Sequence, residues 1–235
     1  MTAPTAAVHS RSVPAAERAK LFQLAALLLT YPDSDLVKAG DTLSAAAARI
    51  EHPHLRRLFD EFLTWLRGTE PIEVQQHYVQ TFDLRRRSGL YLTYYLHGDT
   101  RKRGMALLIL KQRYRAHGLR LAGGELPDLL PVVLEFAAAV GPGDGEAPLR
   151  QHRRGIELLR AALTDLGTPY RLIVDAVTYV LPELTDSDRE AIAALAFDGP
   201  PVEAVGMDPY SPDPHAPNGA ALAPYPTCRA PEAPR

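Results

Sequence analysis

Five aromatic side chains between residues 78 and 95 have the types and spacing that could bind another polypeptide. They are Tyr78, Phe82, Tyr91, Tyr94 and Tyr95. Helical periodicity over 74–82 and over 89–97 would place them on two aromatic helix faces. Tyrosine hydroxyls need hydrogen-bond partners and therefore favour half-buried positions. These faces could line a groove that accepts an amphipathic helix, and the alternative is that the aromatics belong to the core.

A cluster of three cations begins the next predicted helix, which runs from a cap at Asp99 or Thr100 to His117. Arg101, Lys102 and Arg103 would all stand in its first turn, where positive charge opposes the helix dipole. Such a conflict is typical of a site that serves more than folding, and exposed helical amides with cations can bind an anion. The alternative is a solvated charged face.

Two carboxylates, Glu125 and Asp128, flank Pro127 in a loop before another predicted helix that continues to about Val140. Their spacing resembles a carboxylate pair. A helix cap at Asp128, or an acidic rim that selects a basic partner, is favoured over acid–base catalysis.

Catalytic and metal-binding signatures are missing from the sequence. It contains no phosphate-binding loop, no dinucleotide fingerprint and no His-Glu-x-x-His motif, and its only cysteine is Cys228. His52 and His54 are wrongly spaced for one helical face, and His77 and His97 stand alone. We therefore predict no catalytic residue and no metal site.

Composition limits the partners and the compartment. The chain has 235 residues and a formal net charge of −2, which argues against a general nucleic-acid binder. Its N-terminus lacks an apolar signal core, and no stretch approaches the roughly 20 apolar residues that span a bilayer. We expect a cytoplasmic protein without membrane insertion.

All secondary-structure elements of the chain are predicted to be helices, because no alternating strand pattern is present. Their expected ranges are 15–30, 34–50, 53–67, 74–82, 89–97, 100–117, 129–140, 149–166, 169–181 and 186–197. The helix over 100–117 is apolar on two sides, which predicts burial in the middle of a bundle. We expect one all-α, multi-helix domain over 14–198, with a disordered N-terminus over 1–13 and a Pro-rich disordered tail over 199–235.

A family resemblance is carried by the run FDLRRRSGLYLTYYLHGDTRKRGMALL, the ELPD of Glu125 to Asp128, the LPVVLEFAA that follows, and the earlier LLLTYP of Leu27 to Pro32. In these residues the chain resembles the NarJ family, the cytoplasmic assembly chaperones of respiratory nitrate reductase within the TorD-like group. The resemblance covers about residues 16–198. It implies a TorD-like helical bundle and a chaperone without enzymatic activity.

The resemblance also implies a partner and a site. Chaperones of this group bind the N-terminal segment of the apo catalytic subunit and hold it until the molybdenum cofactor is in place. The residues that fall on the family's characteristic segments are Tyr78, Phe82, Asp83, Tyr91, Tyr94, Tyr95, Asp99, Glu125, Pro127 and Asp128. Leu129 stands where relatives often have His, which puts in doubt any role that needs an imidazole there.

We expect no stably bound cofactor, although Arg101, Lys102 and Arg103 could touch the phosphate of the molybdenum cofactor transiently or contact acidic partner segments. A monomer is favoured over a domain-swapped dimer. The rival function is a nucleotide-binding or nucleotide-hydrolysing helical protein, and a DNA-binding regulator is a weaker rival.

Overall fold

Helices form the framework of the chain in the computed structural model, which describes residues 13–198 and 201. The order is α1 Ala15–Leu28, α2 Ser34–Lys38, α3 Gly40–Ala48, α4 Pro53–Gly68, α5 Pro71–Tyr78, the π-helical turn η1 Val79–Asp83, the 3-10 turn η2 Arg86–Ser88, α6 Leu92–His97, α7 Arg101–Ala116, α8 Leu130–Val140, α9 Ala147–Gln151, α10 Arg153–Asp165, α11 Tyr170–Val180 and α12 Asp186–Asp198. Within the described ranges the only β pairing is an isolated antiparallel bridge between Tyr91 and Leu129. The predicted all-α class is confirmed.

The terminal segments that we expected to be disordered, 1–13 and 199–235, lie outside the described residues except at two positions. Val13 is buried against the core, and Pro201 is exposed.

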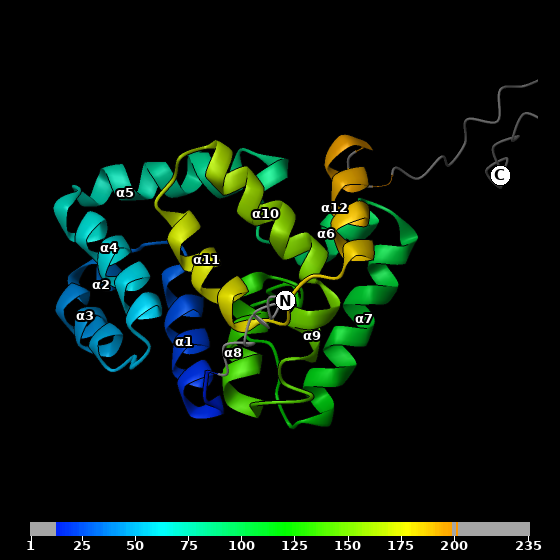
Figure 1. Ribbon diagram of the computed structural model, residues 1–235, viewed down its shortest axis with the longest axis horizontal. Coiled ribbons are helices and arrows are strands. Elements are labelled where there is room, and N and C mark those ends of the chain that lie inside the picture. The colour runs from blue at the N-terminus through cyan, green and yellow to red at the C-terminus, as the bar shows by residue number, and fades with distance from the viewer. Residues whose placement is uncertain (1–12, 199–200, 202–235) are drawn as a thin grey trace, which may run out of the picture. The chain divides into compact units, whose positions relative to one another are not determined.

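The core is built where α1 packs against α8 and α11, and α11 packs against α4 and α10 (Figure 1). The sequence explains α4 well, since its apolar residues recur on one face and its charges on the other. Phe59 and Phe62 are buried on that apolar face. Full burial of such a side chain stabilises the fold by roughly 1.5–3 kcal/mol.

Helix ends follow local signals where those are strong. Asp33 caps α2, because its Oδ1 accepts from the backbone N–H groups of Asp35 and Leu36 at 3.0 and 2.9 Å. Gly98 ends α6 with a φ of 55°. The helix expected over 34–50 is broken at Ala39 into α2 and α3, and the one expected over 89–97 begins only at Leu92.

The predicted burial of the 100–117 helix in the middle of the bundle is wrong, because α7 lies at the edge (Figure 1). Only Leu110 and Tyr114 on this helix are buried, packed with Val132 and Phe136 of α8. Helices therefore cover one of its two apolar sides and leave the other exposed.

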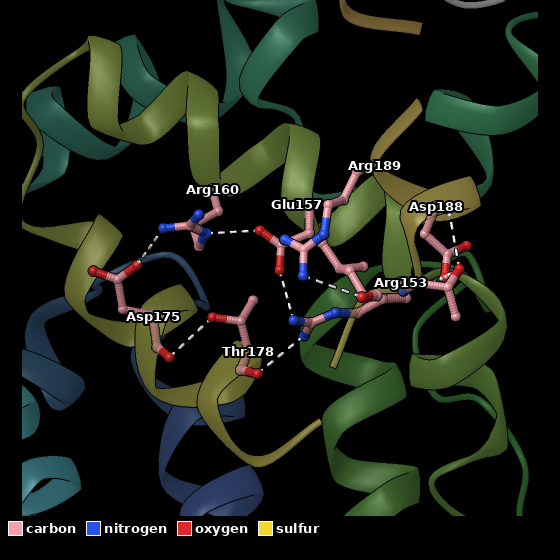
Figure 2. Close-up of polar contacts among 9 residues, drawn as sticks. Arg153, Glu157, Arg160, Asp175, Thr178, Asp188 and Arg189 are labelled. Carbon is pink, nitrogen blue, oxygen red and sulfur yellow. Dashed lines mark hydrogen bonds and ion pairs between the residues drawn. The ribbon is translucent and has the colours of Figure 1, made fainter. Parts of the chain in front are cut away.

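A network of charged residues joins α10 to α11 and α12 (Figure 2). The buried Glu157 pairs with Arg153 at 2.6 Å and with Arg160 at 2.7 Å. Arg160 reaches Asp175 of α11 at 3.4 Å, and Arg154 reaches Asp188 of α12 at 2.9 Å. Since a buried carboxylate needs compensating partners, these contacts help to fix how the three helices pack.

Candidate functional site

The loop before α8 lies directly on the start of α6. Leu92 N–H donates to the Asp128 carbonyl at 3.0 Å, and Leu130 N–H donates to the Leu90 carbonyl at 2.9 Å. These two bonds bring the ELPD loop to the aromatic segment, although the segments are separated by all of α7. The structure thus unites two of the stretches that the sequence singled out.

Asp128 is the buried centre of this junction. Its side chain is 0% exposed, and its Oδ2 accepts from both the backbone N–H and the hydroxyl of Thr93. It therefore caps α6. The prediction that it caps the following helix is wrong, because the side chain turns toward α6, and α8 begins at Leu130 with Leu129 at the N-cap position and no side-chain cap. The other oxygen, Oδ1, has no hydrogen-bond partner among the described residues.

Arg103 joins α7 to the same junction. Its guanidinium lies 3.2 Å from Asp99 and 3.8 Å from Asp128. It also stands 5.8 Å from the ring centroids of both Tyr91 and Tyr94, within the range of cation–π attraction. Four residues that were predicted to bind the partner therefore surround Arg103, namely Tyr91, Tyr94, Asp99 and Asp128. The sequence had suggested for Arg103 only a contact with an anion.

Three other predicted aromatics lie in the core. Tyr78 donates its hydroxyl to the Leu29 carbonyl at 3.1 Å, and Phe82 packs edge-on against Tyr170 with centroids 4.9 Å apart. Tyr95 donates to the Gly89 carbonyl at 2.9 Å. Burial raises the pKa of the Tyr78 and Tyr95 phenols far above the ordinary value. These three side chains therefore belong to the core, as the alternative interpretation of the aromatic residues stated.

The remaining predicted residues differ in exposure. Tyr91 is 41% exposed and Tyr94 is half-buried, so both rings can be reached from solvent beside Arg103. Asp83, Asp99 and Glu125 are exposed, whereas Pro127 is buried and accepts the Tyr114 hydroxyl at 2.6 Å. Of the other two cations, Arg101 and Lys102 stand exposed on the first turn of α7.

Sequence reasoning missed a groove of about 950 Å³ between α7 and the segment 118–127. We call it the α7 groove. Its lining residues are Leu107, Leu108, Lys111, Tyr114, Arg115, Gly118, Leu119, Arg120, Leu121, Gly124, Glu125, Leu126 and Pro127. Near its acidic end the pKa of Glu135 is raised, first by burial and then by repulsion from Glu125. One signal could have found this groove, namely the lack of any Asp or Glu from Thr100 to Gly124.

Among the described side chains, no group of three or more His, Cys, Asp or Glu is arranged to hold a metal ion. None of the helices in the described ranges is both long and apolar enough to cross a bilayer. What the arrangement offers chemically is a half-exposed pair of tyrosines held by an arginine, next to a groove with cationic walls.

The fold places the chain in a known structural class. The structure of a redox enzyme maturation protein from Archaeoglobus fulgidus superposes with a TM-score of 0.52 over 74% of this chain and 97% of that one, at 21% sequence identity. This likeness shows a shared helical fold.

The family follows from the sequence comparisons. Residues 51–172, from near the start of α4 into α11, match the nitrate reductase delta subunit family. The nitrate reductase molybdenum cofactor assembly chaperone NarJ of Escherichia coli K12 is 32% identical over 181 residues, which are 74% of this chain and 75% of NarJ. The chain belongs to the nitrate reductase delta subunit family, which confirms the predicted resemblance.

Two other relatives extend the comparison. The nitrate reductase-like protein NarX of Mycobacterium tuberculosis H37Rv is 43% identical over 157 residues, or 67% of this chain. The match spans only 24% of NarX. A probable NarJ of Bacillus subtilis is 35% identical over 123 residues, which are 52% of this chain and 67% of that protein.

Proposed function

We propose that this protein is a cytoplasmic, non-enzymatic chaperone that binds the apo form of a nitrate reductase catalytic subunit and supports insertion of its molybdenum cofactor. The observation that carries the proposal is family membership together with a relative, NarJ of Escherichia coli, that matches three quarters of this chain and is named as a nitrate reductase molybdenum cofactor assembly chaperone.

The site that we assign to the partner's N-terminal segment is the surface around Tyr91 and Tyr94. The half-exposed rings would bury apolar side chains of the segment, and the exposed Asp99 beside them would attract its cations. Arg103 is proposed as a positioning residue, since its contacts with both rings and with Asp128 fix their orientation.

The buried members of the predicted set would act indirectly. Tyr78, Phe82, Tyr95 and Asp128 hold the helices that carry the exposed rings, and they touch the partner only if the site opens. We propose no stably bound cofactor. The exposed Lys102 and its neighbour Arg101 are suited to transient contact with the cofactor's phosphate or with an acidic partner segment.

A copurification experiment tests the proposal. The catalytic subunit is produced in cells that lack a functional chaperone, together with tagged wild-type protein, with the variant Tyr91→Ala/Tyr94→Ala, or with the control Phe197→Ala on the exposed end of α12. We expect the double variant to recover about tenfold less catalytic subunit, in line with the loss of two aromatic anchors.

The molybdenum content of the matured enzyme provides the second readout. It should fall with the double variant and stay at the wild-type level with Phe197→Ala. Equal recovery and equal molybdenum content for all three proteins would refute the assignment of Tyr91 and Tyr94. Failure of the wild-type protein to recover any subunit would refute the chaperone function itself.

A further inference from the structure

The outward face of α7 carries a triad of exposed apolar side chains. Met105, Leu108 and Ile109 are 59%, 43% and 53% exposed. Their spacing of three and four residues places them side by side on one helix face. Leu108 also lines the α7 groove, so the triad continues into the groove, whose far wall carries Leu119 and Leu126. A contiguous exposed apolar surface of this kind marks an interaction site.

The same stretch of chain is rich in cations. Between Thr100 and Gly124 the chain has seven Lys and Arg residues and no Asp or Glu, although the whole protein has a net charge of −2. Lys111, Arg115 and Arg120 line the groove. None of these three forms an ion pair with the part of the chain that the structure describes, whereas Arg103 faces the other way, toward Asp99 and Asp128.

The structural role of these cations is limited. Arg113 and Arg115 in the last turn of α7 complement its dipole, which accounts for part of the charge. Arg101 and Lys102 in the first turn oppose the dipole, and Lys111 lies in mid-helix. Positive charges therefore extend along the whole length of the exposed face of α7, whereas the helix dipole favours only those in its last turn.

We propose that the α7 groove and the triad beside it bind an acidic amphipathic helix of a partner protein. The apolar side of that helix would lie on the triad and on Leu119 and Leu126, and its carboxylates would face Lys111, Arg115 and Arg120. α7 itself has 16 residues, so a bound helix of roughly four turns, about 24 Å long, matches its length. Anionic groups on the partner follow from electrostatic complementarity.

This surface is distinct from the one proposed for the N-terminal segment. Tyr91 and Tyr94 lie on the α6 side of α7, beside Arg103, whereas the triad is on the side that neither α6 nor α8 covers. The two surfaces also differ in charge, since Asp99 lies beside the tyrosines, whereas the α7 groove is lined by Lys111, Arg115 and Arg120 with Glu125 as its one carboxylate. The inference thus adds a second contact and goes beyond the proposed function.

The test uses the purified full-length protein and two designed peptides of roughly four helical turns. One carries leucines at i, i+3, i+4 and i+7 with glutamates on both flanks, and the other has lysine at every glutamate position. Fluorescence anisotropy should show saturable binding of the acidic peptide only. That binding should weaken by about tenfold between low salt and roughly 0.5 M salt, because exposed charges are screened.

Variants locate the binding. Met105→Ser/Ile109→Ser and Lys111→Glu/Arg115→Glu change exposed side chains and should each weaken binding by about tenfold or more. The matched controls are Ile72→Ser, an exposed apolar residue on α5, and Arg49→Glu/Arg56→Glu, two exposed arginines elsewhere. Both controls should bind like the wild type.

Three results would overturn the proposal. The first is equal binding of the acidic and basic peptides, or equal losses in the control variants. The second is sedimentation of the wild type as a dimer that Met105→Ser/Ile109→Ser converts to a monomer, which would assign the face to self-association. The third is cosedimentation with vesicles of phosphatidylglycerol and phosphatidylcholine without binding of the acidic peptide, which would assign it to an anionic lipid surface.

Discussion

Asp128 connects three segments through one buried carboxylate. It caps α6 at Thr93, forms an ion pair with Arg103 of α7, and belongs to the loop that leads into α8. The same residue is the end of the ELPD motif. Because Asp128 is buried, it acts by holding the surrounding residues in place. The exposed Glu125 is the carboxylate of the motif that can contact a partner directly.

Replacing Asp128 with Ala should therefore affect the fold. The change leaves the Thr93 N–H without its acceptor and should lower the free energy of unfolding by about 1–3 kcal/mol. Asp128→Asn, which keeps an acceptor oxygen, should lose less. Urea denaturation measures the free energy of unfolding of both variants. The control is Glu125→Ala at an exposed position, whose free energy of unfolding should lie within about 0.5 kcal/mol of the wild-type value. An unchanged midpoint for Asp128→Ala would show that the buried cap contributes nothing.

His152 gives the protein a pH-dependent stability. It is 7% exposed and donates Nδ1–H to the Pro148 carbonyl at 2.8 Å. Burial lowers the pKa of this imidazole, opposed by the Pro148 carbonyl and Asp128 and assisted by His97 and Arg113. The native side chain thus stays neutral at a pH where the unfolded chain takes up a proton, near 6.5. Its contribution is present above that pH and is lost as the pH falls below it.

We expect the unfolding free energy of the wild type to fall between about pH 7 and pH 5, and that of His152→Gln to fall less steeply. The variant also loses the Pro148 bond, which should lower its stability by a constant amount at every pH. Urea midpoints across this range separate the two effects. Parallel curves for the two proteins would mean that His152 does not titrate differently in the native and unfolded states.

Among the elements, α6 owes its position to a close approach by α10. A Cβ added at Gly155 would meet the Leu92 carbonyl at 3.2 Å and the Tyr95 Cβ at 3.2 Å, so glycine permits the two helices to touch. At Gly104, on the exposed side of α7, an added Cβ would meet nothing within 4 Å. The two glycines therefore make a matched pair for testing what holds α6.

Gly104→Ala should raise the unfolding free energy by about 0.5–1 kcal/mol, because alanine has the better helix propensity. Gly155→Ala should forfeit that gain and lower stability by about 1 kcal/mol or more, since the backbone of α6 must move away. Denaturation of both variants decides this. Equal stabilisation by the two substitutions would contradict the tight α6–α10 contact.

The elements also show how far the sequence could predict this structure. Caps and breakers act within a few residues, so Asp33, Pro53 and Gly98 marked helix ends correctly. The position of α7 at the edge could not be found in this way, because it depends on which of its apolar sides α8 covers.

The site was predictable in part for the same reason. The aromatic and acidic segments could be singled out from their residue types, but the sequence does not show that Asp128 turns back to Thr93, 35 residues earlier. Nor does residue type separate the exposed Tyr91 from the buried Tyr95, since both stand in one short aromatic run. The family resemblance identified the segments that form the candidate site. Which of their side chains are buried and which are exposed depends on tertiary packing.

At the scale of the whole molecule, charge is divided between two surfaces on opposite sides of α7. The acidic side chain of Asp99 lies beside the tyrosines, and the cations Lys111, Arg115 and Arg120 line the groove next to the apolar triad. A chaperone of this design could hold a basic apolar segment and an acidic amphipathic helix at the same time. Two weak contacts of this kind raise the effective affinity for a partner that carries both.

We propose that the surface around Tyr91 and Tyr94 binds the N-terminal segment of the catalytic subunit. Isothermal titration can measure this binding with a synthetic peptide of that segment, beside a scrambled peptide of equal charge. We expect saturable binding of the native peptide, about tenfold weaker binding to Tyr94→Ala, and no binding of the scrambled peptide. Equal heats from the native and scrambled peptides, or full affinity in the Tyr94→Ala protein, would contradict it.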